Sequence, residues 1–220
     1  MNILFKYPSR SRPIWFKQTL QKYYAMIRNI GQHRFLITLN ADDKTMNNPA
    51  MKNFMKGFPN LVYKYGTHKT KIEAVNADMK DENFDILFLV SDDMIPIVKS
   101  FDEVIVKAMK EYFPNLDGAL HFNVGRFQGN IALSVMGKKL YEKFGYIYNP
   151  IYKSFGADNE FRDVVYRMKK VVYIPQIIVR HVWKGEGGTN NKDALYRRNF
   201  VLGQGDGSLY CSRKSLLRKG

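Results

Sequence analysis

The stretch that decides the fold lies near the middle of the chain and reads DILFLVSDD, residues 85–93. Its apolar part is an unbroken run of strand length, which is typical of a strand buried on both faces of a parallel sheet. Ser91, Asp92 and Asp93 follow directly, so the strand ends at two adjacent carboxylates. The stretch therefore predicts a central strand whose carboxyl end opens onto an acidic loop.

Strands and helices alternate before this stretch. We predict strands at 2–5, 35–39 and 61–65, and helices beginning at Pro13 and covering 49–57 and 71–79. The alternation predicts a parallel, doubly wound sheet. Ligands bind at the carboxyl ends of the strands in such sheets, so the loops that follow these strands are the first places to look for a site.

The second half of the chain has a more mixed pattern. We predict helices at 101–112, 138–144 and 158–169, strands at 117–122, 131–136 and 171–180, a turn at 125–129 and a glycine-rich loop at 185–188. The whole pattern predicts an α/β fold, a single domain over residues 1–191 with a mostly parallel central sheet and helices on both faces. A basic tail follows at 192–220.

Positive charge is concentrated at the two ends of the chain. The formal net charge is +15, from 35 basic and 20 acidic residues. Residues 1–34 contain seven basic residues and no acidic one, and residues 192–220 contain seven basic and two acidic ones. A field of that sign attracts nucleotide phosphates, nucleic acid, acidic glycans or anionic membranes, although scattered surface lysines also serve solubility.

Several classes of protein are disfavoured. Cys211 is the single cysteine, which excludes an internal disulfide and a cysteine zinc cluster. No apolar run approaches the roughly 20 residues of a membrane span, and the first apolar residues are too few for a signal peptide. We therefore expect a soluble, cytoplasmic protein. P-loop, dinucleotide-binding and nucleophile-elbow motifs are also absent from their expected positions.

Two groups of residues are candidate metal ligands. Asp92 and Asp93 repel each other unless a cation compensates them, and a divalent metal that bridges phosphate oxygens would do so. His181, at the end of a late strand, is a candidate further ligand. A capping turn and a histidine that hydrogen-bonds to the backbone are the structural alternatives.

Other polar residues fall on the same expected edge of the sheet or at helix starts. Asp158 and Glu160 stand where a helix begins, as helix-stabilising acids or as a general base. Arg10 and Arg12 lie in the loop after the first strand, where they suit a diphosphate. Lys71 and Asn76, on the helix after the third strand, are nucleotide-binding candidates or surface residues.

The order of these features resembles the GT-A class of glycosyltransferases, close to the family 2 type, over roughly residues 1–183. The loop 8–13, with Ser9, Arg10 and Arg12, is similar to the family's nucleotide-binding loop. Asp42 matches the acid set against the base or ribose of the donor, and the segment from Lys71 to Asn76 matches the one that lines the base. The resemblance divides the domain into a nucleotide-sugar half, 1–115, and an acceptor and catalytic half, 116–191.

The same resemblance implies roles for the acids and the histidine. Asp92 would face the ribose, and Asp93 would hold the metal, with Ser91 in place of the first acid of the DXD-type motif. His181 falls where several members place a further metal ligand. Asp158, with Glu160 two residues later, resembles the acidic catalytic motif of inverting members, and either acid is a candidate base.

These inferences predict an enzyme. The resemblance implies transfer of a hexosyl or pentosyl group from a nucleotide-sugar donor to a hydroxyl, with inversion and with Mn²⁺ or Mg²⁺ at Asp93 and His181. The loop 181–192 would close as a lid. A nucleotidyltransferase and a non-catalytic nucleic-acid-binding protein are the alternative functions.

The charge distribution suggests a polyanionic acceptor. Aromatic residues alternate with basic ones near 196–200 and 210–214, as in surfaces where aromatics stack on bases while cations contact phosphates. We therefore expect DNA carrying a hydroxymethylated base as the acceptor, reached in single strands or by base flipping. A surface glycan or a lipid-linked acceptor is the alternative.

Overall fold

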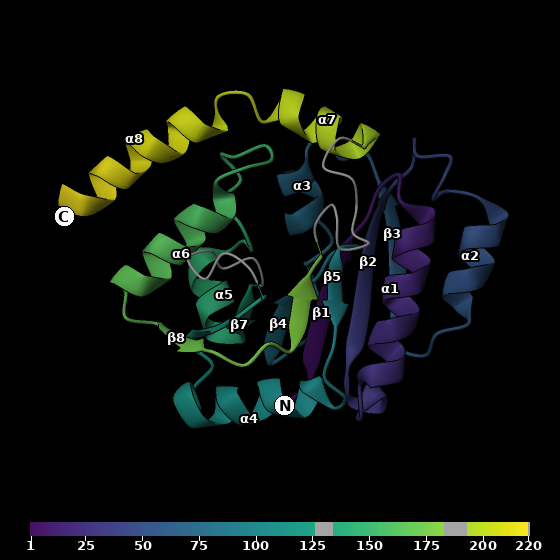
Figure 1. Ribbon diagram of the computed structural model, residues 1–220, viewed down its shortest axis with the longest axis horizontal. Coiled ribbons are helices and arrows are strands. Elements are labelled where there is room, and N and C mark those ends of the chain that lie inside the picture. The colour runs from purple at the N-terminus through teal and green to yellow at the C-terminus, as the bar shows by residue number, and fades with distance from the viewer. Residues whose placement is uncertain (126–133, 183–192, 220) are drawn as a thin grey trace.

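A seven-stranded sheet runs through the computed structural model, which describes residues 1–125, 134–182 and 193–219 (Figure 1). The strand order is β3-β2-β1-β4-β7-β6-β8. The bounds are β1 Ile3–Pro8, β2 Arg34–Asn40, β3 Leu61–Gly66, β4 Ile86–Leu89, β6 Ala119–Phe122, β7 Val135–Gly137 and β8 Val171–Ile174. All pairings are parallel except the two made by β7, so the mostly parallel sheet expected from the sequence is confirmed.

β4 is the central strand, and all of its residues are buried, as the hydrophobic run predicts. Helices cover both faces of the sheet because side chains of successive strand residues point to opposite faces. One buried cluster joins Phe5 and Phe35 of the sheet to α1, α2 and α4, and the other joins Leu4 and Leu87 to α3, α5 and α6. The helix bounds are α1 Pro13–Met26, α2 Pro49–Lys56, α3 Lys71–Asn76, α4 Phe101–Tyr112, α5 Lys138–Phe144 and α6 Ala157–Arg167.

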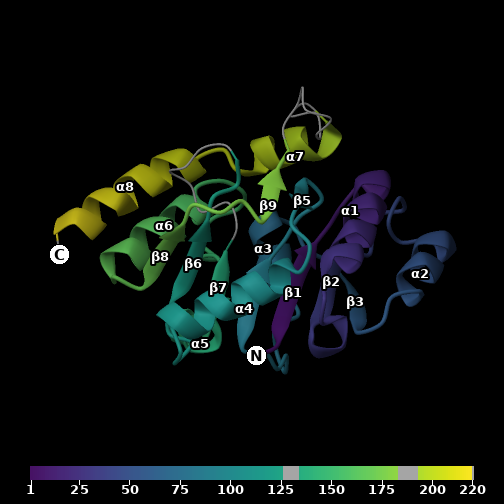
Figure 2. The same ribbon diagram turned by 60° about the horizontal axis from the view of Figure 1, so that its bottom comes forward.

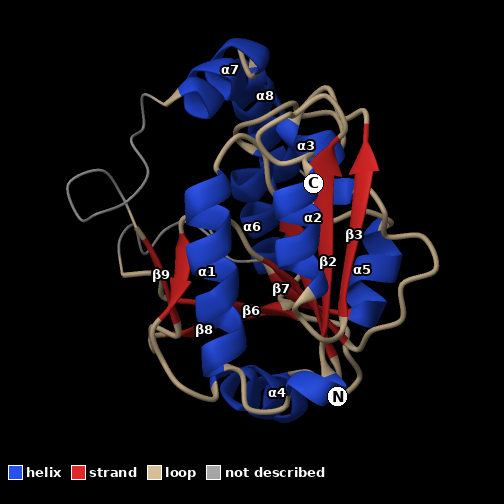
Figure 3. Cartoon of the chain, turned by 90° about the vertical axis from the view of Figure 1, so that its right-hand side faces the viewer, coloured by secondary structure: helices blue, strands red, loops and turns tan. Residues whose placement is uncertain are grey.

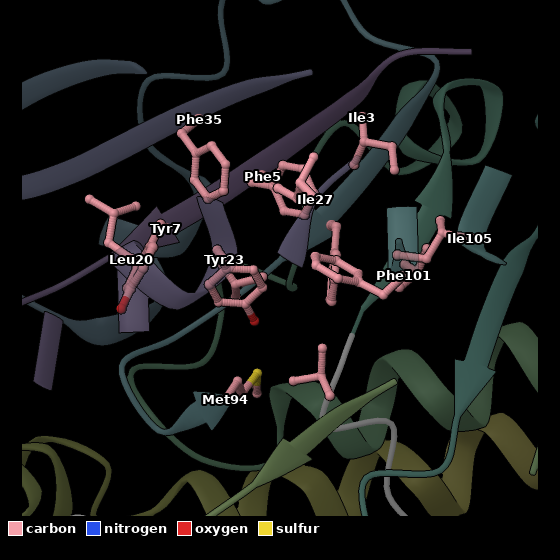
Figure 4. Close-up of a cluster of buried hydrophobic side chains, with 14 of the residues drawn as sticks. Ile3, Phe5, Tyr7, Leu20, Tyr23, Ile27, Phe35, Met94, Phe101 and Ile105 are labelled. Atoms are coloured by element: carbon pink, nitrogen blue, oxygen red, sulfur yellow. The ribbon is translucent and has the colours of Figure 1, made fainter. Parts of the chain in front are cut away.

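Aromatic rings dominate the first cluster (Figure 4). Phe5 stacks on Phe35 with ring centroids 4.5 Å apart, and Tyr23 of α1 and Phe101 of α4 pack against this pair. Stacked and edge-to-face pairs of this kind add to the stabilisation gained by burying apolar area. The cluster fixes β1, whose carboxyl end carries the loop of Ser9, Arg10 and Arg12.

The strand predicted at 171–180 is divided in two. β8 extends the main sheet, whereas β9 (Val179–His181) pairs antiparallel with β5 (Met94–Pro96) in a separate two-stranded sheet. Pro175 follows β8, and proline has no N–H to donate to a strand ladder. The single-strand prediction was therefore wrong, and the division directs His181 away from the main sheet.

The segment predicted as a basic tail contains two helices, α7 (Ala194–Leu202) and α8 (Asp206–Lys219). Asp193 caps α7 by accepting a hydrogen bond from the backbone N–H of Tyr196 at 2.7 Å. Both helices lie at the end of the molecule toward which β2 and β3 point (Figure 3). α8 lies beside α6 (Figure 2). The turn at 126–129 and the glycine-rich loop 185–188 lie outside the described residues.

Candidate active site

The loops after β1 and β4 are joined by a buried hydrogen bond. β1 and β4 are parallel neighbours, so their carboxyl ends lie together. The Ser9 hydroxyl donates to the Asp92 carboxylate, with distances of 2.9 and 3.2 Å to its two oxygens. Asp92 is buried, and burial raises its pKa to about 7 although the nearby Arg12 opposes the shift. The hydrogen bond between Ser9 and Asp92 thus joins the loop after β1 to the loop after β4.

Asp93 faces His181 and Arg12. Its Oδ1 lies 3.6 Å from His181 Nε2, and its Oδ2 lies 3.5 Å from Arg12 Nη1. The pairing of Met94 with His181 between β5 and β9 brings the two sequence-distant residues together. Burial alone would raise the pKa of Asp93, but His181, Ser91 and Arg12 lower it well below the usual range. Asp93 is therefore ionised at neutral pH.

These residues line one pocket of about 330 Å³. It is bounded by the loops after β1 and β4, by α3, by the segment that enters α6, by β9 and by α7. Such a volume lies in the range of small-molecule sites. Of the residues singled out in the sequence, those that line it are Ser9, Arg10, Arg12, Lys71, Ser91, Asp92, Asp93, Asp158 and His181.

The two candidate bases are separated. Asp158 is the second residue of α6 and lines the pocket, while its Oδ1 accepts a hydrogen bond from the N–H of Asn159 at 2.9 Å. Glu160 is buried outside the pocket lining, where it accepts hydrogen bonds from Asn149 at 2.6 Å and from Tyr152 at 2.8 Å. It also forms an ion pair with Arg213 of α8. The Glu160 carboxylate thus joins α6 to the 149–152 segment and to α8. Of the two acids, only Asp158 lines the pocket.

Asp42 and Asn76 lie outside the pocket lining. Arg10 makes a two-pronged ion pair with Asp42, at 2.7 and 2.8 Å, and this hydrogen bonding lowers the pKa of Asp42 to about 2. Asn76 binds backbone groups: its amide donates to the Ile147–Tyr148 segment at Tyr148 O, and its Oδ1 accepts from both N–H groups of that segment. Asp42 therefore restrains Arg10, and Asn76 joins α3 to the segment before α6.

Sequence reasoning did not single out several lining residues. His68 Nε2 and Ser154 Oγ are buried side-chain atoms without a hydrogen-bond partner in the described part of the chain. His68 follows β3, so the rule about carboxyl ends of strands pointed to its loop without selecting it. Arg198 of α7 also lines the pocket and donates to Lys69 O at 2.7 Å. No signal in the sequence placed α7 here.

The donor set fits a divalent cation that is shared with a phosphate ligand. Among residues 1–125, 134–182 and 193–219, no group of three or more histidine, cysteine or acidic side chains could hold a metal by itself. Asp93 and His181 supply one carboxylate and one imidazole, and Mg²⁺ or Mn²⁺ completes such a shell with phosphate oxygens and water. The two residues can therefore hold the metal together with a bound diphosphate.

The fold is that of the GT-A-type glycosyltransferases, which use nucleotide sugars. The chain is similar to the mannosyltransferase PcManGT from Pyrobaculum calidifontis, solved with GDP-Man and Mn²⁺. The TM-score is 0.67 at 13% identity, over 84% of this chain and 58% of that one. It is also similar to residues 1–349 of TarS from S. aureus, with a TM-score of 0.66 at 12% identity, over 83% of this chain and 60% of that one.

The chain thus spans less than two thirds of the solved chains described above. TarS 1–349 has also been solved in complex with UDP-GlcNAc, and the likeness there has a TM-score of 0.64. No family model and no curated protein sequence matches the chain. No helix among the described residues is long and apolar enough to cross a membrane.

Proposed function

We propose that this protein transfers a sugar from a nucleotide-sugar donor to a hydroxyl group of an acceptor. The observation that carries the proposal is the convergence of Asp93, His181, Arg12 and Asp158 on one pocket of a GT-A fold. Residues 1–115 would supply most of the donor site, and 116–191 most of the acceptor and catalytic site. Donors of the kinds in the solved relatives, GDP-mannose and UDP-GlcNAc, are the first to test.

Each side chain has a role in the proposed reaction. Arg10, Arg12 and Lys71 would bind the nucleotide and its diphosphate. Asp93 and His181 would hold Mn²⁺ or Mg²⁺, which supplies positive charge against the leaving diphosphate. Asp158 would accept the acceptor's proton while the acceptor oxygen bonds to the anomeric carbon and the bond from that carbon to the phosphate oxygen breaks. Attack opposite the leaving group inverts the anomeric carbon.

We assign the base to Asp158 because of the different surroundings of the two acids. Glu160 is held by Asn149, Tyr152 and Arg213 and has no position on the pocket wall. A general base must reach the proton that it accepts, directly or through one water. Asp158 lines the pocket, so it is the acid of the pair that would reach an acceptor bound there.

A thermal-shift experiment tests donor binding. GDP-mannose and UDP-GlcNAc, each with and without Mn²⁺, are added to wild type and to the Asp93→Ala variant. A ligand that binds only the folded state stabilises it and so raises the melting temperature. At a free ligand concentration of a hundred times Kd, the free energy of unfolding rises by about 2.7 kcal/mol. We expect a Mn²⁺-dependent shift with one donor in wild type and its loss in Asp93→Ala. An unchanged Mn²⁺-dependent shift in the variant would reject the metal assignment.

For the acceptor we propose a polyanion, with DNA that carries a hydroxymethylated base as the first candidate. The DNA proposal is supported by α7, one side of which lines the pocket. On the same helix Phe200 is 56% exposed and Arg197 is exposed as well. Aromatic and basic groups together suit nucleic acid. Binding through about six phosphates should weaken roughly a thousandfold between 50 and 200 mM salt. Absence of DNA binding at low salt would favour a surface glycan or a lipid-linked acceptor.

A further inference from the structure

The first turn of α8 contacts the segment that presents Asp158. Asp206 is buried, with 4% of its surface exposed. Its carboxylate accepts hydrogen bonds from three successive backbone N–H groups: Lys153 at 3.2 Å, Ser154 at 2.7 Å and Phe155 at 2.9 Å. Successive N–H groups that converge in this way form a concave anion site. The acid thus joins α8 to the backbone of the 153–155 segment.

Two glycines allow this close approach. A Cβ at Gly203, in the turn between α7 and α8, would lie 2.8 Å from Phe155 Cδ2 and 3.0 Å from Ser154 Cβ. Gly156 has a φ of +77° and directly precedes α6. The turn before α8 is therefore packed directly against the segment that leads to Asp158, two residues beyond Gly156.

The same segment also contacts the donor side of the pocket. Lys153 O accepts a hydrogen bond from Ile72 N of α3 at 3.2 Å, while Lys153 N donates to Asp206. Ser154, Phe155 and Ile72 line the pocket. The segment therefore forms part of the pocket wall and also leads into the start of α6.

We infer that Asp206 is a positioning residue, which sets Asp158 in place for proton abstraction through the 153–155 segment. This inference rests on the proposed function, and it makes the C-terminal helices part of the catalytic apparatus. Asp206 lies outside the pocket lining, so it acts through the backbone of the segment and not by touching substrate. Misplacement of a reacting group by about 1 Å can lower a rate about a hundredfold.

The test compares two acids that each join α8 to another part of the chain: Asp206 to the 153–155 segment, and Asp163 to α6. Asp206→Asn replaces one acceptor oxygen by an NH₂ group, which cannot accept the N–H bonds of the segment. Asp163→Asn is the matched control. Asp163 accepts a hydrogen bond from Tyr210 of α8 at 2.6 Å and forms an ion pair with Lys214 at 3.7 Å, whereas the N–H groups of 153–155 donate to Asp206. Turnover is followed as release of nucleoside diphosphate from the donor selected by thermal shift, with Mn²⁺ and with water as acceptor. Amide hydrogen exchange is followed in peptides that cover 153–158.

In Asp206→Asn we expect kcat to fall about 10- to 100-fold with donor KM changed less than about twofold. Exchange at residues 153–155 should become at least about tenfold faster. Asp163→Asn should lower the melting temperature but keep kcat and this exchange. Asp206→Glu, which keeps the charge, should fold and recover part of kcat. If Asp206→Asn does not fold, Asp206→Glu is used in its place. Its kcat should then be lower than that of wild type, with an unchanged donor KM.

Three results would overturn the inference in distinguishable ways. If exchange at 153–155 rises but kcat equals that of the Asp163→Asn control, the segment does not position the base, and sugar transfer itself stands. If Asp158→Asn keeps wild-type turnover, the base assignment fails and the inference fails with it. Unchanged exchange in Asp206→Ala, which has no acceptor oxygen at all, would show that the carboxylate does not hold the segment.

Discussion

At the scale of single residues, neighbouring acids in this site differ because their surroundings differ. Asp92 is buried against Ser9 with a pKa raised to about 7, whereas Asp93 is kept ionised by His181, Ser91 and Arg12. The sequence placed both acids correctly at the end of a buried strand. It could not distinguish their charge states, because the groups that decide them come from distant parts of the chain.

Asp158→Asn should lower turnover by about 10² to 10⁴ while leaving the Mn²⁺-dependent donor shift nearly intact, because a base acts on the acceptor's proton and not on donor binding. Steady-state release of nucleoside diphosphate and the thermal shift measure the two effects separately. Loss of donor binding in the variant would instead place Asp158 in the donor site. A product that retains the donor's anomeric configuration would reject single-step inversion.

Buried Lys6 gives a pH-dependent prediction. Burial lowers its pKa from 10.5 to about 7, and its Nζ donates to Thr38 and to Ala77 O at 2.6 Å. The Lys6 ammonium group therefore keeps its proton to a higher pH in the unfolded chain than in the folded one. The free-energy cost of burying Lys6 is at its full value below about pH 7, and it decreases as the pH rises toward 10.5. The urea midpoint of wild type relative to Lys6→Met should therefore rise between pH 7 and 9. A flat difference would contradict this linkage.

At the scale of elements, the hydrophobic patterns predicted the strands and helices of the first half well, because each carries its own periodicity. The second half was predicted less well, for physical reasons. Pro175 divides a continuous apolar run, β5 is too short to show a period, and α7 and α8 have mixed faces. The contact between Asp93 and His181 depends on β5 pairing with β9, which no local pattern encodes.

The joint between α6 and α8 predicts a stability effect for Glu160. Glu160→Gln removes the ion pair with Arg213 and leaves a partly buried guanidinium without its counter-charge. Because Arg213 is about one third exposed, we expect a loss of roughly 1–3 kcal/mol, below the full cost of breaking a buried pair. Urea unfolding measures it. Turnover below the melting temperature should stay within about threefold of wild type. An inactive but stable variant would return the base role to Glu160.

At the scale of the whole molecule, the mostly parallel sheet brings the loops after β1 and β4 to one edge, and α7 lies over that edge (Figure 3). The order of strands and helices in the sequence predicted that these loops lie at the carboxyl edge of the sheet. The position of α7 at the pocket and the contact of α8 with the 153–155 segment required the structure, since Arg198 and Asp206 reach their partners only through tertiary packing.

Product analysis tests the central claim most directly. Purified protein is incubated with the donor that binds, Mn²⁺ and either hydroxymethylated single-stranded DNA or a glycan acceptor, and the nucleotide products are separated. Sugar transfer predicts nucleoside diphosphate in amounts equal to the sugar found on the acceptor, with both lost in Asp158→Asn. Pyrophosphate with a nucleoside monophosphate joined to the acceptor would contradict the account and indicate nucleotidyl transfer instead.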